Sequence, residues 1–338
     1  RDEGLAGSEP GETQGSAPSG RRGGPGGPAD GAALRSASGP LPAFRAHLRK
    51  PDDPRIAGIA DLRDVLDAFH APGLPPRAQL EAKVADDLER LCQLHDPSTI
   101  AAVIVEPCAG STGYLPPPKG YLQRLRQICD KHGILLIFDE VITGFGRLGA
   151  AFAAEFFGVI PDLMTVAKGI SNATVPMGGV FVRKHVYDGL MNGPENAIDL
   201  FHGYTYSAHP LACAAALAVL DIYKNEGLFQ RAADLSKYWE DGVHSLKSAP
   251  GVTDVRNLGL AAGIDFESRK DAPGARGYDT FVKAFELGLM VRQSGDCIAM
   301  SPPLIIEKAD VDEMLDRVGK ALDALAVQIR RDQIAVVR

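Results

Sequence analysis

Residues 134–140 read Ile-Leu-Leu-Ile-Phe-Asp-Glu, a short apolar run that ends in two carboxylates. A second apolar run, residues 163–169, reads Leu-Met-Thr-Val-Ala-Lys-Gly and ends in an amine. Both runs have the length of strands buried in a parallel sheet and are shorter than a typical globular helix. Because ligands of open α/β sheets bind outside the carboxyl ends of the strands, we expect Asp139 and Lys168 to face one binding crevice.

An acid and an amine in one crevice are the two groups that a pyridoxal phosphate site needs. The amine forms a Schiff base with the cofactor, and the acid bonds to the nitrogen of the pyridinium ring. A strand that ends in Asp-Glu also occurs at the magnesium site of P-loop NTPases, but no stretch of this sequence fits the phosphate loop G-x-x-x-x-G-K-[ST]. A nucleotide-binding module built on Asp139 and Glu140 is therefore the weaker alternative. A lysine after a strand is by itself usually a solvated strand end, so the pair gains weight only from its surroundings.

Length, charge and composition restrict the class of protein. The chain has 338 residues, 45% of them hydrophobic, which is enough for two globular domains. Its formal net charge of −7 and its pI near 5.7 argue against nucleic acid or an anionic membrane as the main partner. No apolar stretch approaches the ~20 residues that span a bilayer. The five cysteines are scattered and the eight histidines lack ligand spacing, so we expect a cytoplasmic protein with reduced thiols and no metal.

The first 80 residues differ from the rest of the sequence. They contain 13 of the 37 glycines and 11 of the 24 prolines, a share typical of disordered or low-complexity sequence. Residues 1–80 are therefore predicted to be largely disordered, apart from a short amphipathic helix within residues 56–69. The segment lacks the apolar core of a secretion signal, and its early acidic residues argue against a transit peptide. Two origins stay open for it: translation of GC-rich DNA in a shifted frame, and a lineage-specific tail.

From residue 79 onward the hydrophobic pattern is regular. Helices are predicted over residues 81–94, 119–132 (with Gly133 as the C-terminal cap), 210–225, 228–246, 278–287 and 309–325. Strands are predicted over residues 99–105, 134–139, 163–167, 179–182, 252–256, 260–266, 289–292 and 297–301. The strand–helix alternation of the first part indicates an α/β domain with a mostly parallel sheet at residues 81–226. The order of the later elements indicates a smaller α+β domain at residues 227–328.

Three ordered motifs surround the two strand ends. They are Asp139-Glu-Val-Ile-Thr-Gly-Phe-Gly-Arg147, Pro161-Asp-Leu-Met-Thr-Val-Ala-Lys168-Gly169 and Phe201-His-Gly-Tyr-Thr205-Tyr-Ser-Ala-His-Pro210. With these motifs the sequence from about residue 82 to about residue 325 resembles the class III aminotransferases, and among them most closely the omega-amino acid (β-alanine):pyruvate transaminases. The resemblance implies the type I fold of pyridoxal phosphate-dependent transferases, with a mostly parallel large domain, a smaller C-terminal α+β domain, and a homodimer with shared sites.

The resemblance also implies roles for residues near the strand ends. Lys168 becomes the catalytic base, which holds pyridoxal 5'-phosphate and moves the proton of the substrate. Asp139 binds the ring nitrogen of the cofactor. Val141 packs against one face of the ring, although a valine in this position is otherwise ordinary core. Glu140 and Arg147 are predicted to serve the architecture of the fold.

Further positions carry over from the family. Thr205 matches the residue that gives its hydroxyl and backbone amide to the cofactor phosphate across the dimer interface, and Ala208 stands where the family usually has glycine. Arg292 aligns with the arginine that binds the substrate carboxylate, for which a planar guanidinium is well suited. A surface salt bridge is the alternative for Arg292. Ser111 stands where ornithine and γ-aminobutyrate transaminases tend to carry an acid, which favours a β-alanine or general amine donor with pyruvate as acceptor.

Part of the family pattern has no match in this sequence. Unmatched are the Gly-Ser-rich turn that holds the cofactor phosphate at a helix N-terminus, the aromatic residue that stacks on the ring and the N-terminal segment of the substrate pocket. Two hypotheses follow. In the first, the chain is a pyridoxal phosphate-dependent transaminase that moves an amino group from a small-molecule omega-amino acid or amine to the 2-oxo acid pyruvate. In the second, it is a truncated, impaired homologue that acts as an inactive fragment or as a partner subunit of an intact relative.

Overall fold

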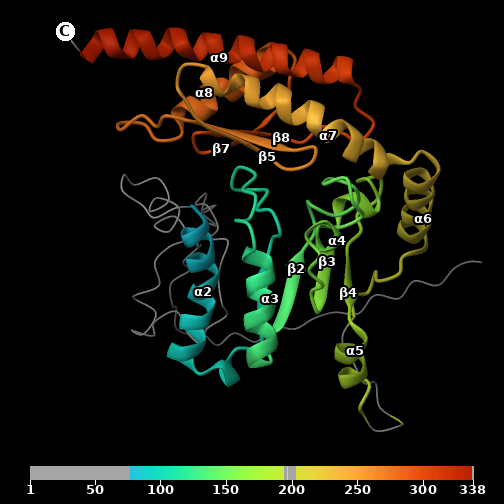
Figure 1. The fold of residues 1–338 in the computed structure, drawn as a ribbon. Coiled ribbons are helices and arrows are strands. Elements are labelled where there is room, and N and C mark those ends of the chain that lie inside the picture. Colours follow the sequence, from blue (N-terminus) through green and yellow to red (C-terminus); the bar gives the residue numbers. More distant parts are fainter. Residues whose placement is uncertain (1–76, 194–195, 197–202, 337–338) are drawn as a thin grey trace, which may run out of the picture. The chain divides into compact units, whose positions relative to one another are not determined.

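The computed structural model describes residues 77–193, 196 and 203–336. The predicted helix within residues 56–69, and the predicted disorder up to residue 76, lie outside the described residues. The described helices of more than one turn are α2 (Arg77–His95), α3 (Tyr121–His132), α4 (Ala153–Phe157), α5 (Lys184–Leu190), α6 (Pro210–Asn225), α7 (Leu228–His244), α8 (Ala275–Glu286) and α9 (Lys308–Val336). The described strands are β1 (Ala102–Val105), β2 (Leu135–Asp139), β3 (Leu163–Val166), β4 (Gly179–Val182), β5 (Val252–Asn257), β6 (Ala262–Phe266), β7 (Arg292–Ser294) and β8 (Cys297–Met300). These strands form two four-stranded sheets (Figure 1).

The first sheet has the strand order β1-β2-β3-β4. Strands β1, β2 and β3 run parallel, and β4 runs antiparallel to β3. The predicted α/β architecture with a mostly parallel sheet is therefore confirmed. Burial alternates along β2, where Leu136 and Phe138 are fully buried. They share one core with apolar residues of α2 and α3, among them Leu88 and Leu125.

Helix α3 shows how the local sequence sets the limits of an element. Leu122, Leu125, Ile128 and Cys129 recur at helical spacing, and all four are buried. The helix ends at Gly133, whose φ of 69° is left-handed and whose backbone N–H donates to the carbonyl of Cys129. Glycine adopts this conformation without the steric cost that a Cβ adds, so the predicted C-terminal cap is confirmed.

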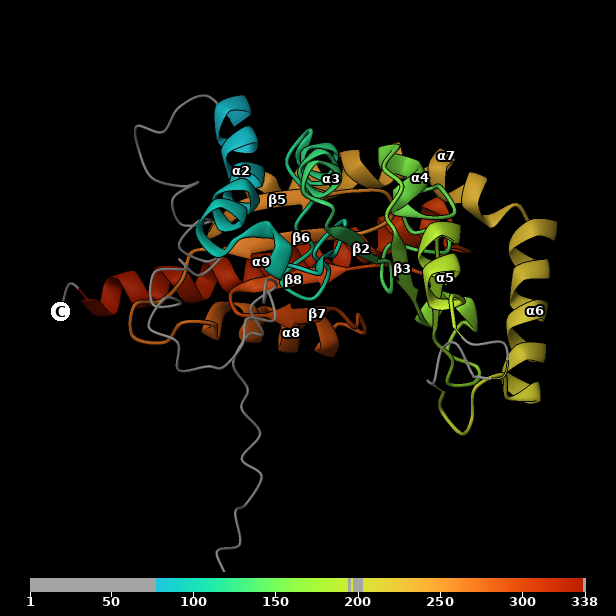
Figure 2. The same cartoon turned by 90° about the horizontal axis from the view of Figure 1, so that it is seen from below.

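The second sheet is antiparallel, with the strand order β5-β6-β8-β7. Helices α7, α8 and α9 cover one of its faces (Figures 1 and 2). The core between helices and sheet includes Trp239, Ile264, Ile298 and Leu322, which are fully buried. Burying an aliphatic or aromatic side chain of this size contributes roughly 1.5–3 kcal/mol, so the second sheet has a substantial core of its own.

Apolar side chains are also exposed on several elements, among them β4 and α6. All four residues of β4 are exposed, and β4 is the last strand of its sheet in the described part of the chain. Helix α6 exposes Leu211, Leu217 and Leu220. None of the described helices combines the length and the hydrophobicity that crossing a membrane requires.

Candidate active site

Strands β2 and β3 end side by side. In their parallel register Asp139 lies opposite Thr165, and Lys168 comes just after β3. The acid and the amine therefore leave the same edge of the sheet from neighbouring strands. The half-buried Asp139 accepts a hydrogen bond at Oδ1 from the backbone N–H of Val141 at 3.0 Å. Within the described residues, Asp139 Oδ2 has no hydrogen-bond partner and Lys168 has no ion pair.

A cavity of about 420 Å³ lies beside these strand ends. Its wall includes three of the predicted site residues, Val141, Lys168 and Arg292, whereas Asp139 and Thr205 are not part of the wall. The volume lies within the range of small-molecule sites, which is roughly 300–1,000 Å³. No residue of the wall is acidic. The structure thus brings the predicted lysine and arginine together at one cavity of small-molecule size.

The backbone at Lys168 is strained and held in place. Lys168 has a φ of 44° and opens a short 3₁₀ turn, Lys168–Ile170. A non-glycine residue in the left-handed region costs roughly 1–3 kcal/mol and persists only where its surroundings fix it. Here Tyr223 of α6 donates its hydroxyl to the Gly169 carbonyl at 2.7 Å, and a Cβ at Gly169 would come within 2.7 Å of Phe145. Tyr223, which the sequence did not single out, therefore helps to fix the lysine.

Glu140 is fully buried below the strand end. Its carboxylate accepts hydrogen bonds from the Thr143 hydroxyl at 2.6 Å and from the backbone N–H groups of Ala153 and Ala154 at 2.8 and 2.7 Å. Burial raises its pKa, and these three donors oppose the shift. Glu140 thus holds the first turn of α4, as expected of an architectural residue.

Arg147 has a structural contact and also faces the cavity. Its Nη1 donates to the carbonyls of Leu260 and Pro302 at 3.0 and 2.5 Å, and its own carbonyl accepts from the Leu260 N–H at 3.0 Å. These bonds connect the loop after β2 to the segments that flank β6 and β8. Arg147 also lines the cavity, so the predicted architectural role is incomplete. Burial lowers its pKa, and only the phenols of Tyr114 and Tyr223 oppose the shift.

A second loop of the cavity wall, which contributes Gly110 and Tyr114, is held by Arg256 of β5. Arg256 donates to the Gly113 carbonyl at 2.7 Å through Nη2 and to the Tyr114 carbonyl at 3.1 Å through Nε. It also forms an ion pair with Asp265 of β6. The second sheet therefore positions part of the cavity wall.

The remaining predicted residues, Arg292 and Thr205, are exposed, as Lys168 is. Arg292 begins β7 and has no ion pair within residues 84–193 and 203–331, so the alternative of a surface salt bridge finds no partner there. Thr205 lies in the exposed turn before α6. In the same turn Ala208 has a φ of 55°, a left-handed conformation that favours the glycine expected at this position. The sequence assigned Thr205 to a site shared between two subunits, and that role stays a prediction.

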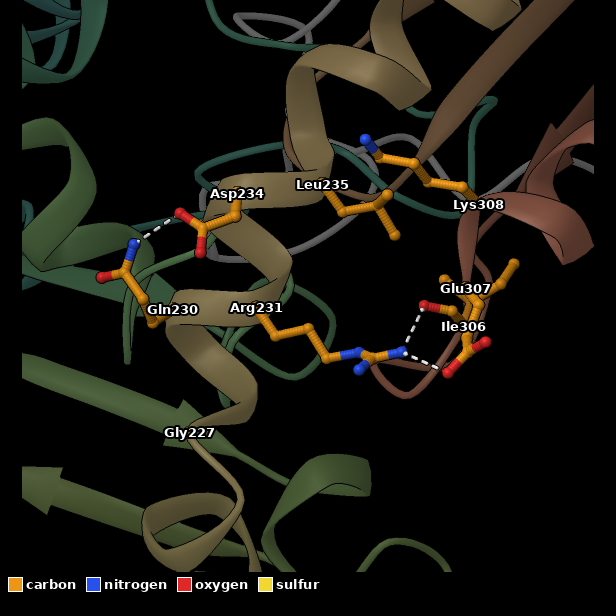
Figure 3. Close-up of a pocket in the computed structure, with 8 residues that line it drawn as sticks. All are labelled: Gly227, Gln230, Arg231, Asp234, Leu235, Ile306, Glu307 and Lys308. Carbon is orange, nitrogen blue, oxygen red and sulfur yellow. Dashed lines mark hydrogen bonds and ion pairs between the residues drawn. The ribbon is translucent and has the colours of Figure 1, made fainter.

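A more open cavity of about 650 Å³ lies between α7 and the start of α9 (Figure 3). Its polar side chains come in pairs: Gln230 donates to Asp234 at 2.8 Å, and Arg231 lies 3.6 Å from Glu307. Arg231 also donates to the carbonyls of Ile305 and Ile306. Together with Lys308 the wall carries two cations and two carboxylates, so its charges balance, unlike those of the first cavity.

Neither cavity holds a set of metal ligands. In the described part of the chain, no group of three or more His, Cys, Asp or Glu side chains could bind a metal ion. The five cysteines are free thiols, four of them buried. Burial raises the pKa of Cys129 to about 11 and that of Cys108 to about 12, so these thiols are unreactive near neutral pH.

A sequence model described as "Aminotransferase class-III" matches residues 64–322. The chain belongs to the class III aminotransferase family. The family match begins at residue 64, whereas the motifs indicated a resemblance only from about residue 82.

Named relatives agree with the family match. The chain is 60% identical over 259 residues to an omega-aminotransferase of Caulobacter vibrioides, a match that covers 75% of this chain and 59% of the relative. It is 50% identical to a beta-alanine–pyruvate aminotransferase of Pseudomonas aeruginosa, over 72% of this chain and 55% of the relative. The chain thus spans less than two thirds of the length of these aminotransferases.

Solved transaminase structures share the fold. A transaminase from ancestral reconstruction superposes with a TM-score of 0.73 at 38% identity, over 77% of this chain and 59% of that chain. The omega transaminase of Pseudomonas jessenii in complex with PMP gives a TM-score of 0.73 at 32% identity, over 77% and 58%. The predicted transferase fold of this aminotransferase chain is therefore confirmed.

Proposed function

We propose that this class III aminotransferase chain catalyses amino-group transfer from an omega-amino acid or amine of the β-alanine type to pyruvate, with pyridoxal 5'-phosphate as cofactor. The observation that carries the proposal is the cavity that Lys168, Val141 and Arg292 share beside the ends of β2 and β3. Named relatives that act on β-alanine and pyruvate support the substrate class. The cysteine thiols are free, which supports the reducing cytoplasm as the compartment.

Lys168 and Val141 of the cavity wall fit the cofactor, and so does Asp139, which lies outside the wall at the end of the neighbouring strand β2. When bound, it supplies an aldehyde for the lysine and a ring that accepts electrons from the substrate. Lys168 Nζ has no protein partner within the described residues, so this amine is available to hold the group and then to move the proton of the substrate carbon. Asp139 Oδ2 is similarly without a donor and would hold the protonated ring nitrogen, while Val141 would pack on the ring.

We propose that the two parts of the chain, each with one of the sheets, bind different groups. Residues 81–226 would bind the cofactor. Residues 227–328 would contribute Arg292, which would bind the carboxylate of the substrate and would move aside for the uncharged end of an amine donor. Because Arg292 is exposed and without an ion pair in the described part of the chain, its guanidinium is available for a carboxylate.

We further propose a homodimer, in which Thr205 of one chain serves the phosphate site of the other. Two observations support an interface here. The turn that carries Thr205 exposes the aromatic rings of Tyr204 and Tyr206, and α6 after it exposes Leu211 and Leu217. Exposed aromatic and aliphatic side chains that gather on one segment are typical of contact surfaces between proteins.

A second candidate function is that of an impaired homologue, inactive alone or serving as the partner subunit of an intact relative. The observation that favours it is the composition of the cavity wall, which lacks both Asp139 and Thr205. Without the hydrogen bonds of a phosphate site, each worth roughly 1.5–3 kcal/mol for a charged acceptor, cofactor affinity would fall by orders of magnitude.

Titration with pyridoxal phosphate distinguishes the two functions. We expect a visible absorbance band that borohydride removes, with the reduced cofactor attached to the peptide that contains Lys168. Alanine formation from pyruvate should then appear with β-alanine as donor. Lys168→Ala should lose both signals, and Lys184→Ala, which removes an exposed lysine paired with Asp188, should keep them. A wild-type chain without the band at saturating cofactor would support the impaired homologue.

A further inference from the structure

The cavity carries an excess of positive charge. Its wall includes Arg147, Lys168 and Arg292 and no acidic residue. Among the described residues, none of these three side chains forms an ion pair. Lys168 and Arg292 are exposed, whereas Arg147 is half-buried, and a guanidinium that is partly withdrawn from water without a counter-ion is costly. Three unpaired cations around one cavity therefore indicate an anionic ligand. The proposed function uses Lys168 and Arg292 and leaves Arg147 without a chemical role.

One edge of the Arg147 guanidinium is fixed and the other is free. Nη1 donates to the carbonyls of Leu260 and Pro302, and the backbone carbonyl of Arg147 is bonded to the Leu260 N–H. A guanidinium has five N–H donors in a rigid plane, and Nε and Nη2 have no partner among the described residues. The guanidinium of this cavity-wall residue is thus fixed by the bonds of Nη1, while Nε and Nη2 stay available.

We infer that Arg147 is a substrate-binding residue whose free Nε–Nη2 edge binds a carboxylate in the cavity. A planar pair of N–H donors matches the two oxygens of a carboxylate, and a pre-fixed side chain loses little entropy on binding. Arg147 would be the fixed carboxylate site of the cavity and the exposed Arg292 its movable one. The inference rests on the proposed function in one respect only. That function identifies the carboxylate as part of the amine donor or of the 2-oxo acid.

Arg231 provides a matched control for this inference. It too donates to two backbone carbonyls, in this case both in the segment before α9, those of Ile305 and Ile306 at 2.9 and 3.0 Å. It lines the other cavity, where Glu307 lies nearby (Figure 3). A role limited to holding the segment of residues 302–306 would be shared by both arginines, whereas carboxylate binding would belong to Arg147 alone.

Binding of propionate to the full chain without cofactor tests the inference, because propionate has a carboxylate and no reactive group. Calorimetry should give measurable binding to the wild type and to Arg231→Gln. Loss of one charge-assisted contact should weaken binding to Arg147→Gln by about 10- to 100-fold. Arg147→Lys, which keeps the charge, should bind propionate about 3- to 10-fold more weakly than wild type. This variant provides the test if Arg147→Gln fails to fold.

Three results would overturn the inference: no propionate binding to the wild type, equal weakening in the Arg231 and Arg147 variants, or undiminished binding to Arg147→Lys and Arg147→Gln. Inorganic phosphate is the competing probe. Arg147-dependent binding of phosphate without binding of propionate would place the cofactor's phosphate at this arginine and overturn the substrate assignment. Since the assay omits the cofactor, its result is independent of the absorbance band, so failure of the proposed function and failure of this inference are distinguishable.

Discussion

Ala208 occupies a backbone conformation that suits glycine. Its φ is 55°, and it lies in the exposed turn before α6. Because the left-handed region costs an L-residue roughly 1–2 kcal/mol, Ala208→Gly should raise the free energy of unfolding by about 0.5–1 kcal/mol after the added freedom of the unfolded chain is subtracted. Urea denaturation measures the change. Ala214→Gly, in the middle of α6, is the control and should lower the same quantity by about 1 kcal/mol.

Glu140 predicts a pH-dependent stability. Burial raises its pKa above the ordinary value of 4.5, so the folded chain binds this proton more tightly than the unfolded chain. The contribution of Glu140 to stability is therefore complete below pH 4.5 and decreases as the pH rises through the folded pKa. Glu140→Gln should lower the free energy of unfolding by about 2 kcal/mol at pH 7, because the amide has to face backbone N–H groups. The difference in the free energy of unfolding between the wild type and Glu140→Gln should increase as the pH falls towards 4.5.

Glu155 is the control for this experiment. It also lies in α4 and accepts a backbone hydrogen bond, from Ala151, but it is exposed. Glu155→Gln should change the free energy of unfolding by less than about 0.5 kcal/mol at each pH. Equal effects of the two substitutions would contradict a special role for the buried carboxylate.

The sequence predicted only part of the candidate site. Lys168 and Val141 follow from strand ends and a short motif, and the structure places both at one cavity with Arg292. The sequence predicted an architectural role for Arg147 but missed its place in the cavity wall, and it missed the contribution of Tyr223. Both residues act through partners that are distant in the chain. Arg147 donates to Leu260, 113 residues away, and Tyr223 donates to Gly169, 54 residues away, and no local sequence pattern encodes such contacts.

At the scale of elements, strand β6 allows a close approach of the loop that holds Gly113. A Cβ built on Gly263 would lie 2.1 Å from the Gly113 carbonyl oxygen, closer than any real contact. Gly263→Ala should therefore lower the free energy of unfolding by about 2–3 kcal/mol and should loosen the loop that Arg256 holds. Chemical denaturation with hydrogen exchange of residues 110–115 measures both effects.

Gly189 is the matched control for Gly263. It lies in helix α5, and a Cβ built there meets nothing within 4 Å. Gly189→Ala should raise the free energy of unfolding by roughly 0.5–1 kcal/mol, because alanine favours a helix over glycine. If hydrogen exchange of residues 110–115 is as slow in Gly263→Ala as in the wild type, the close approach of Gly263 to the loop is dispensable.

Elements with a clear period were predictable, and short ones were not. Helix α6 and strand β4 have the predicted bounds of residues 210–225 and 179–182. Helices α4 and α5 were missed, because elements of 5 and 7 residues are too short for a helical period. Strand β7 was predicted over residues 289–292 and lies at Arg292–Ser294, where its pairing with β8 decides its position. Helix α9 continues beyond residue 325, the end that the apolar pattern predicted.

For the whole molecule, the exposed face of α6 predicts the oligomeric state. Leu217 is 64% exposed on a helix that also exposes Leu211 and Leu220. If this face joins two chains, Leu217→Lys places two charges in an apolar contact and should convert the dimer to a monomer. Size-exclusion chromatography with light scattering measures the mass. Leu94→Lys is the control: this leucine of α2 is 69% exposed, and its substitution should leave the dimer intact.

The wall of the cavity has a thermodynamic consequence for the two cores. Residues before position 226, such as Lys168, and residues after it, such as Arg292, line the same space. A ligand that contacts both sets of residues binds only when both cores are folded. At a concentration of one hundred times its dissociation constant, it stabilises this folded state by about 2.7 kcal/mol. Because the two cores are separate, we expect the empty protein to melt in two steps, one for each core. Saturation should merge these steps into a single calorimetric transition, so that occupancy is readable from the shape of the melting curve.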